Sequence, residues 1–325
     1  MSQFKRVFIG RPIIKEAVDI IKNAGFEVDM WEERLILPTE DEMCERSKGV
    51  HGLYTLGPQK VTKKILDAAG DQLKVVSAMS VGVDAIDLVE LKSRGIRLGH
   101  TPGVLTDAVA ELAVGLLLST SRRIIEQAHV AKSGHWSTWD PFGDLGCGLR
   151  NSTVGIVGLG RIGSAVARRL VPFGVSKIVY NSRSEKPEAK EFNAQYLSFD
   201  ELLAVSDFVI CCCSMNDSSK ELFNESAFSK MKSSAILVNI GRGGMVDQNA
   251  LVKALQNNQI RGAGLDVTTP EPLPKEHPLY QFPNVCILPH IGSAEIQTRT
   301  DMATMAARNL VAALTGEKMP AEYPL

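Results

Sequence analysis

The sequence predicts an α/β protein of two domains, each built on a doubly wound parallel sheet. Its 325 residues are enough for two domains. Short apolar segments alternate with segments of helical spacing along nearly the whole chain. This alternation is typical of parallel strands that helices cover on both faces. A glycine-rich turn between one such strand and the next helix is the third observation, because parallel α/β sheets bind ligands at turns of this kind.

The composition is that of an ordinary globular protein, with 44% hydrophobic and 22% charged residues. The 36 Lys and Arg nearly balance the 37 Asp and Glu, so no basic surface predicts binding to nucleic acid or to a membrane. No apolar run reaches the roughly 18 residues of a membrane span. Met1, Ser2 and Gln3 lead directly into a predicted strand, so we expect no signal peptide.

Cysteine usage favours a reducing compartment. Three of the six cysteines, Cys211 to Cys213, are consecutive in an apolar segment, an arrangement poorly suited to disulfides or to a zinc site with spaced ligands. We therefore expect buried free thiols, no metal site and a cytoplasmic protein.

The first hundred residues repeat a strand–helix pattern, which predicts one parallel sheet. Gly25 is placed to end the first helix, and Thr39 precedes three acidic residues, as expected of a helix N-cap. The predicted strands span residues 5–10, 26–31, 52–57, 73–79 and 96–100, and the predicted helices span residues 13–24, 62–69 and 84–93, with another beginning after Thr39.

The middle of the chain breaks this pattern. Residues 107–123 form a long helix that is apolar nearly all round, so we expect it to be buried at a domain junction or a subunit contact. Residues 133–148 are interpreted as a long ordered loop. Its Trp136 and Trp139 fit packing or an interface, and a place at the rim of a substrate pocket is the alternative.

From residue 154 the alternation resumes and predicts a second parallel sheet. We expect the last helix to return to the first domain, because too little sequence follows it to form a structure of its own. The predicted strands span residues 154–158, 177–181, 208–213, 235–240, 262–267 and 285–288, and the predicted helices span residues 164–170, 200–204 (after an Asp200 cap), 226–231, 248–257 and 295–314.

The glycine turn has the spacing G-x-G-x-x-G, formed by Gly158, Gly160 and Gly163. In this motif the glycines serve a tight turn, a close approach of pyrophosphate to the backbone, and close packing of helix on strand. The helix N-terminus then offers N–H groups and the positive end of its dipole to the anion. The strand before the turn and the helix after it supply the context that dinucleotide binding requires.

The strand after this turn predicts the preferred cofactor. An acidic residue normally ends it and binds the ribose 2′-OH of NAD, but here the strand ends in Asn181 followed by Ser182, Arg183 and Ser184. Arg183 is placed to pair with a 2′-phosphate, helped by one of the serines. The sequence therefore favours NADP(H) over NAD(H), with a solvated surface charge as the alternative interpretation of Arg183.

Three later strands end in residues suited to ketone reduction: Arg242, Glu271 after Asp266, and His290. Hydride addition to a carbonyl builds negative charge on oxygen, which His can neutralise by donating a proton. A carboxylate can orient the imidazole, and a guanidinium can bind a carboxylate and polarise the carbonyl. Taken singly, each residue also fits a structural or solvated role. Their shared position after strands, downstream of a nucleotide turn, favours chemistry.

At this point the chain resembles the D-isomer-specific 2-hydroxyacid dehydrogenases over nearly its whole length, and most closely the glyoxylate reductase/hydroxypyruvate reductase branch. The residues that carry the resemblance are SVGVD (80–84), TDAVAE (106–111), VGIVGLGRIG (154–163), NIGRGGMVD (239–247), GLDVTTPEPLP (264–274) and LPHIGSA (288–294). The departure from the common NAD pattern is the missing acidic residue after Tyr180.

The resemblance implies a Rossmann nucleotide-binding domain (residues 105–296) inserted into a flavodoxin-like substrate domain (residues 1–104 and 297–325). It implies a homodimer, with the helix at 107–123 as a dimer element. The catalytic residues would be Arg242, Glu271 and His290, with His290 as the proton donor.

The resemblance also implies the ligand contacts. The N–H groups of Val81 and Gly82 would bind the substrate carboxylate, and Asp266 would hold the nicotinamide carboxamide. The implied substrate-binding residues are Val81, Gly82, Arg242, His290 and Ser293, and the implied cofactor-binding residues are Thr106, Gly158, Gly160, Arg161, Ile162, Gly163, Ser182, Arg183, Ser184, Ser214, Ile240, Asp266 and Gly292.

The predicted activity is reduction of small 2-keto acids, glyoxylate to glycolate and hydroxypyruvate to D-glycerate, with NADPH preferred and NADH as the alternative donor. Other D-2-hydroxyacid dehydrogenases, acting on 3-phosphoglycerate or D-lactate, are the enzyme alternatives. A nucleotide-sensing binding protein is the alternative of another class. The chain ends at Leu325 soon after its last helix, so we expect neither a regulatory domain nor a docking tail.

Overall fold

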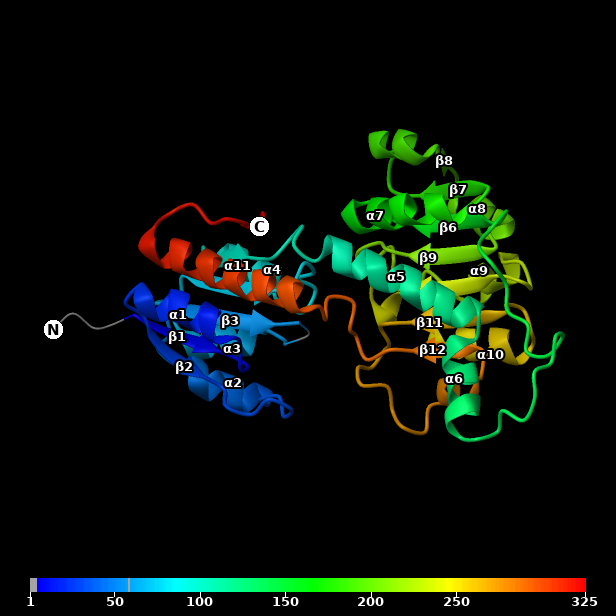
Figure 1. The fold of residues 1–325 in the computed structure, drawn as a ribbon. Helices are drawn as coiled ribbons and strands as arrows, with labels where there is room; N and C mark the ends of the chain where they lie inside the picture. The colour runs from blue at the N-terminus through cyan, green and yellow to red at the C-terminus, as the bar shows by residue number, and fades with distance from the viewer. Residues whose placement is uncertain (1–4, 58) are drawn as a thin grey trace. The chain divides into compact units, whose positions relative to one another are not determined.

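The computed structural model describes residues 5–57 and 59–325, so Met1, Ser2 and Gln3 lie outside the described residues. The chain divides into two compact units (Figure 1). Met1–Leu105 and Ala294–Leu325 form the first, and Thr106–Ser293 form the second. Each unit is an α/β fold with its own all-parallel sheet, which confirms the predicted fold class.

The first unit has a five-stranded sheet in the order β2-β1-β3-β4-β5. Its order places β1 between β2 and β3, as in a doubly wound sheet. The strands are β1 (Arg6–Ile9), β2 (Glu27–Met30), β3 (Gly52–Leu56), β4 (Val75–Met79) and β5 (Arg97–Gly99), and the helices are α1 (Lys15–Asn23), α2 (Glu40–Ser47), α3 (Lys63–Ala69), α4 (Leu88–Ser93) and α11 (Ile296–Thr315).

Local caps explain where two of these helices begin. Thr39 caps α2 as predicted: its hydroxyl accepts from the Glu42 N–H, and the Glu42 carboxylate accepts from the Thr39 N–H. The helix predicted over residues 84–93 begins only at Leu88. Asp87 caps it by accepting from the Glu90 N–H at 3.0 Å, and this cap sets the later start.

The last helix, α11, completes the first unit (Figure 1). The buried Tyr54 hydroxyl donates to the Ala303 carbonyl at 3.0 Å, and the Ser77 hydroxyl donates to the Ala306 carbonyl at 2.7 Å. The Asn309 amide donates to the carbonyl of His100 at 2.8 Å. These bonds join the end of the chain to strands from its first hundred residues.

The second unit has a seven-stranded sheet in the order β12-β11-β10-β9-β6-β7-β8. The strand order reverses between β6 and β9, and ligands of parallel α/β sheets bind at such a switch point. The strands are β6 (Thr153–Val157), β7 (Lys177–Asn181), β8 (Gln195–Tyr196), β9 (Phe208–Cys211), β10 (Ile236–Asn239), β11 (Gly262–Leu265) and β12 (Val285–Ile287), and the helices are α5 (Thr106–Ser121), α6 (Ile124–Lys132), α7 (Arg161–Leu170), α8 (Phe199–Val205), α9 (Glu225–Lys230) and α10 (Gln248–Gln256), with short 3₁₀ turns at Val171–Phe173, Pro187–Phe192, Gly243–Met245 and Pro278–Gln281.

Several predicted boundaries in this unit were wrong. The helix predicted to reach residue 123 ends at Ser121, because Arg123 adopts a left-handed conformation (φ 56°) and starts the separate helix α6. The N-cap of α8 is Ser198 rather than Asp200. Helix α7 begins at Arg161, earlier than predicted, and the short strand β8 was not predicted at all.

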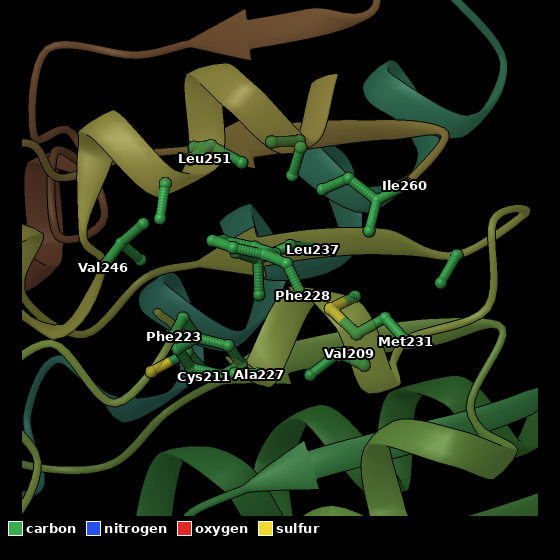
Figure 2. Close-up of a cluster of buried hydrophobic side chains, with 14 of the residues drawn as sticks. Val209, Cys211, Phe223, Ala227, Phe228, Met231, Leu237, Val246, Leu251 and Ile260 are labelled. Carbon is green, nitrogen blue, oxygen red and sulfur yellow. The ribbon is translucent and has the colours of Figure 1, made fainter. Parts of the chain in front are cut away.

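The core of the second unit fills the space between the strands β9–β11 and the helices α9 and α10 (Figure 2). Phe223, Phe228, Leu237 and Leu251 are essentially inaccessible to solvent there. Burial of large apolar side chains at about 25 cal/mol per Å² is the main stabilising contribution to such a core. It holds the carboxyl ends of these strands in a rigid frame.

Candidate active site

The glycine turn lies between β6 and α7, at the switch point of the second sheet. Gly158 has φ 97°, and a Cβ there would lie 2.6 Å from the Cα of Cys213. A Cβ at Gly163 would overlap the carbonyl oxygen of Gly158. Both positions therefore require glycine, one for the turn and the strand beside it, the other for helix-on-strand packing.

Gly160 differs from these two glycines, because a Cβ there would meet no atom within 4 Å. Packing within the described residues thus does not explain the glycine, whereas a ligand approaching the backbone would. Gly160 is also the N-cap of α7, and no side chain caps that helix. The first N–H groups of α7 are therefore suited to a pyrophosphate, which is the fit that a dinucleotide requires.

The end of β7 carries the residues predicted to select the cofactor. The Ser182 hydroxyl accepts from the Leu159 N–H at 2.9 Å, so it ties this strand end to the glycine turn. The Asn181 amide donates to the Leu197 carbonyl at 2.9 Å. Arg183 and Ser184 are exposed, and Arg183 has no ion-pair partner among the residues that the structure describes. The guanidinium remains accessible to an anion.

The residues predicted to do chemistry follow three neighbouring strands. β10 pairs with β11 and β11 pairs with β12, all parallel. Arg242, Asp266 and His290 come shortly after the carboxyl ends of these strands. Residues far apart in sequence therefore meet at one edge of the sheet, the same edge from which the glycine turn leaves β6.

Glu271 and His290 form a hydrogen-bonded pair. His290 Nδ1 lies 2.8 Å from Glu271 Oε2, and the two side chains are 39% and 28% exposed. The other carboxylate oxygen, Oε1, accepts from the Thr268 N–H at 3.1 Å. Burial alone would raise the pKa of Glu271, but the hydrogen bond and charge of His290, the Thr268 N–H and the charge of Arg242 hold it below its usual value. Glu271 is thus held ionised against the imidazole.

Asp266 fixes the backbone that carries the histidine. Its carbonyl accepts from the His290 N–H at 2.9 Å, while its two carboxylate oxygens accept from the N–H groups of Ile291 and Gly292 at 2.7 and 2.8 Å. One residue thus binds three consecutive N–H groups. His290 itself has φ 54°, a conformation that the surroundings must stabilise in a non-glycine residue.

Asp266 is almost completely buried, with 2% of its surface exposed to solvent. Burial raises the pKa of Asp266, although its two backbone hydrogen bonds and the charge of His290 oppose the shift. The family resemblance implies that Asp266 holds the nicotinamide carboxamide, and nothing in the sequence indicates this backbone role.

Arg242 is held by its own turn. The fully buried Asn239 brackets it: the Asn239 amide donates to the Arg242 carbonyl at 2.9 Å and accepts from the Gly241 N–H at 3.0 Å. Arg242 Nη1 donates to the Gly241 carbonyl at 2.9 Å. A buried Asn at the end of an apolar strand is a signal from which this bracket could have been found in the sequence.

The remaining predicted residues divide between the units. Val81 and Gly82 follow β4 in the first unit, where the Ser80 hydroxyl donates to the Gly82 carbonyl at 2.7 Å, and their carboxylate-binding role stays a prediction. All other predicted site residues belong to the second unit. There Thr106 begins α5, Arg161 and Ile162 begin α7, Ser214 follows β9, Ile240 is buried after β10, and Gly292 and Ser293 follow His290.

Within residues 5–57 and 59–325, no group of three or more His, Cys, Asp or Glu side chains is arranged to hold a metal ion. In the same part of the chain, every helix is too short or too polar to cross a membrane.

Comparison with known proteins shows which family the chain resembles. Residues 114–292 match the NAD-binding domain model of the D-isomer-specific 2-hydroxyacid dehydrogenases. The glyoxylate reductase/hydroxypyruvate reductase of Homo sapiens is 50% identical over 98% of both chains, and that of Mus musculus is 49% identical over 100% of this chain and 99% of its own length.

Solved structures agree. A protein from Thermus thermophilus has a TM-score of 0.92 at 42% identity, covering 98% of this chain and all of its own. The NADPH-dependent glyoxylate/hydroxypyruvate reductase of Sinorhizobium meliloti, solved in complex with NADP and malonate, has a TM-score of 0.86 at 33% identity, covering 99% of this chain and 97% of its own.

Proposed function

Because the chain belongs to the D-isomer-specific 2-hydroxyacid dehydrogenase family, we propose that it reduces glyoxylate and hydroxypyruvate to the corresponding 2-hydroxyacids with NADPH. The family is one of NAD(P)-dependent oxidoreductases. The observation that carries the proposal is the Glu271–His290 pair, held near the charge of Arg242 in a unit whose glycine turn fits a dinucleotide.

The residues present can perform this reduction. A bound reduced nicotinamide supplies the hydride. His290 donates a proton from Nε2 to the oxygen on which charge develops, while Glu271 holds Nδ1 and so fixes the orientation of the ring. Arg242 binds the carboxylate of the keto acid and stabilises the developing negative charge. Glyoxylate and hydroxypyruvate both carry that carboxylate beside the reacting carbonyl.

The test is the loss of absorbance at 340 nm with purified protein, using NADPH and NADH in parallel. Glyoxylate, hydroxypyruvate, pyruvate and 3-phosphohydroxypyruvate are compared as substrates. Turnover with the first two and NADPH supports the proposal. Turnover confined to pyruvate or to the phosphorylated acid would replace it by another dehydrogenase of the family. Nucleotide binding without any turnover would favour a sensor.

The preference for NADPH is supported by the accessible guanidinium of Arg183 and by the absence of a carboxylate at Asn181 and Ser182. A 2′-phosphate would meet a cation there and no repelling charge. NADH stays the alternative donor, because the glycine turn serves both nucleotides equally.

We also propose a homodimer, in the cytoplasm. The helix α6 and the loop after it expose several large apolar side chains, which on a monomer would contact water. They include Ile124, Ile125, Trp136, Trp139 and Phe142, with Phe142 84% exposed. Light scattering should give twice the chain mass, and the double variant Trp136→Ser, Trp139→Ser should lower the measured mass towards that of one chain.

The proposed cytoplasmic location is supported by the cysteines. All six are free thiols, as expected in a reducing compartment.

A further inference from the structure

The side chain of Gln248 forms a clamp on the loop that carries Glu271. Gln248 Nε2 donates to the Thr269 carbonyl at 2.5 Å, and the Thr269 N–H donates to Gln248 Oε1 at 2.8 Å. One amide thus binds both polar groups of a single peptide residue, as a neighbouring strand would. A side-chain amide offers a donor and an acceptor side by side, as this arrangement requires.

The clamp has a rigid base. Gln248 is the first residue of α10, and the Asp247 carboxylate caps that helix by accepting from the N–H groups of Asn249 and Ala250, both at 3.0 Å. The neighbouring residues Ala250 and Leu251 are buried in the core of the second unit. The amide therefore projects from a fixed helix start towards an exposed loop residue.

Thr269 lies two residues before Glu271 in the same loop. The preceding residue, Thr268, donates its N–H to Glu271 Oε1 at 3.1 Å and its hydroxyl to the Pro270 carbonyl at 2.9 Å. Pro270 and Pro272 flank Glu271 and have no N–H with which to anchor this backbone. The position of the carboxylate therefore depends on how Thr268 and Thr269 are held.

Thr268 is held by contact with the turn of Arg242. A Cβ at Gly243 would overlap the Thr268 carbonyl, so the backbones of the two loops touch at this point. The clamp lies at the next residue of the loop. Gly243 and Gln248 together join the Arg242 loop and α10 to the Glu271 loop.

We propose that Gln248 is a positioning residue for the reduction: through Thr269 it holds the Glu271 carboxylate against His290 Nδ1. This inference rests on the proposed function. The clamp does not touch the glycine turn, so its loss should change the chemical step and not nucleotide binding. Misplacing a catalytic group by about 1 Å can cost up to roughly 100-fold in rate.

The test compares Gln248→Leu, which removes both bonds, with Gln248→Glu, which keeps an acceptor for the Thr269 N–H but sets a carboxylate against the Thr269 carbonyl. Asn249→Leu, at an exposed position of the same helix, is the matched control. We expect kcat with glyoxylate to fall roughly 10- to 100-fold in Gln248→Leu, with the Kd for NADPH unchanged and Asn249→Leu behaving as wild type.

A pH profile separates positioning from a general loss of structure. Contact with His290 holds the pKa of Glu271 below its usual value, so releasing the loop should raise that pKa. The acid limb of the kcat profile should therefore move to higher pH in both Gln248 variants. If Gln248→Leu fails to fold, Gln248→Glu decides the matter by the same measurements.

Two measurements do not depend on turnover. Hydrogen exchange of the peptide spanning residues 266–273 should speed up in the Gln248 variants, because the Thr269 N–H loses its acceptor or its geometry. Carboxyl ¹³C titration should show a raised pKa for Glu271. If the wild type reduces no keto acid but both changes occur, the proposed function fails and the clamp stands. If kcat stays within twofold and neither change occurs, the clamp is wrong.

Discussion

Two regions at the carboxyl ends of the strands in the second unit differ sharply in how they are held. After β11 and β12, Asp266 binds three consecutive N–H groups, and both oxygens of Glu271 are hydrogen bonded. After β7, Arg183 and Ser184 are exposed. The bonds to the glycine turn are made by the residues before them, the Asn181 carbonyl and the Ser182 hydroxyl. In the same sheet, the residues after β11 and β12 are held by hydrogen bonds, whereas the region after β7 carries an accessible charge.

The two tasks explain the difference. A proton donor is effective only if its ring already has the orientation of the transition state, so the protein must supply the partners itself. A residue that selects a 2′-phosphate gains its partner when the nucleotide binds. A guanidinium that is already paired would have to break that pair first, and an accessible one does not.

The largest effect is expected from removing His290, the reacting group of the hydrogen-bonded region after β11 and β12. His290→Ala should lower kcat by about 10²–10⁴, because the variant loses the imidazole that Glu271 orients as the proton donor. Steady-state kinetics with glyoxylate and NADPH measure this. His129→Ala, on the exposed face of α6, is the control and should leave kcat unchanged. Activity within tenfold of wild type would contradict the role of His290.

A smaller effect should follow from weakening the hydrogen bonds by which Asp266 holds the backbone around His290. Asp266→Asn replaces one acceptor by an NH₂ that faces a backbone N–H, and such hydrogen bonds to a charged group contribute about 1.5–3 kcal/mol each. Because burial raises the pKa of Asp266, removing the charge offsets part of the loss, so we expect the lower part of this range.

Urea unfolding measures the change for Asp266→Asn, and kcat should fall with it as His290 loses its fixed backbone. Asp217→Asn, at an exposed position, is the control and should stay within about 0.5 kcal/mol of wild type. A variant as stable and as active as wild type would show that the two bonds to the Asp266 carboxylate do not hold the histidine.

The smallest effect concerns Arg183, the accessible charge after β7. Arg183→Ala should weaken NADPH binding by about tenfold, the value of one charge-assisted hydrogen bond at an exposed site, and leave NADH binding unchanged. Fluorescence titration with both nucleotides measures it, with NADH as the internal control. Equal losses for both nucleotides would remove the basis for the predicted preference, and the loss for NADPH should shrink at high salt.

Much of the fold could be predicted because its signals are local. Apolar runs and helical spacing locate the strands of both sheets except the two-residue β8, and the Thr39 cap is visible in four consecutive residues. Helix α6 was missed because it depends on Arg123 taking a left-handed conformation, which residue type does not predict for Arg. The late start of α4 depends on which of two aspartates, Asp84 or Asp87, acts as the cap.

Residues near one another in the chain specify the strand–helix alternation, the three glycines of the turn, the missing acid after Tyr180, and an Arg, a Glu and a His after three strands. All of these can be recognised without coordinates. The adjacency of β10, β11 and β12 emerges only in the folded chain, as do the bonds of Asp266 to Ile291 and of Gln248 to Thr269, across 25 and 21 residues. Such pairings depend on where folded segments meet, and no local pattern encodes that.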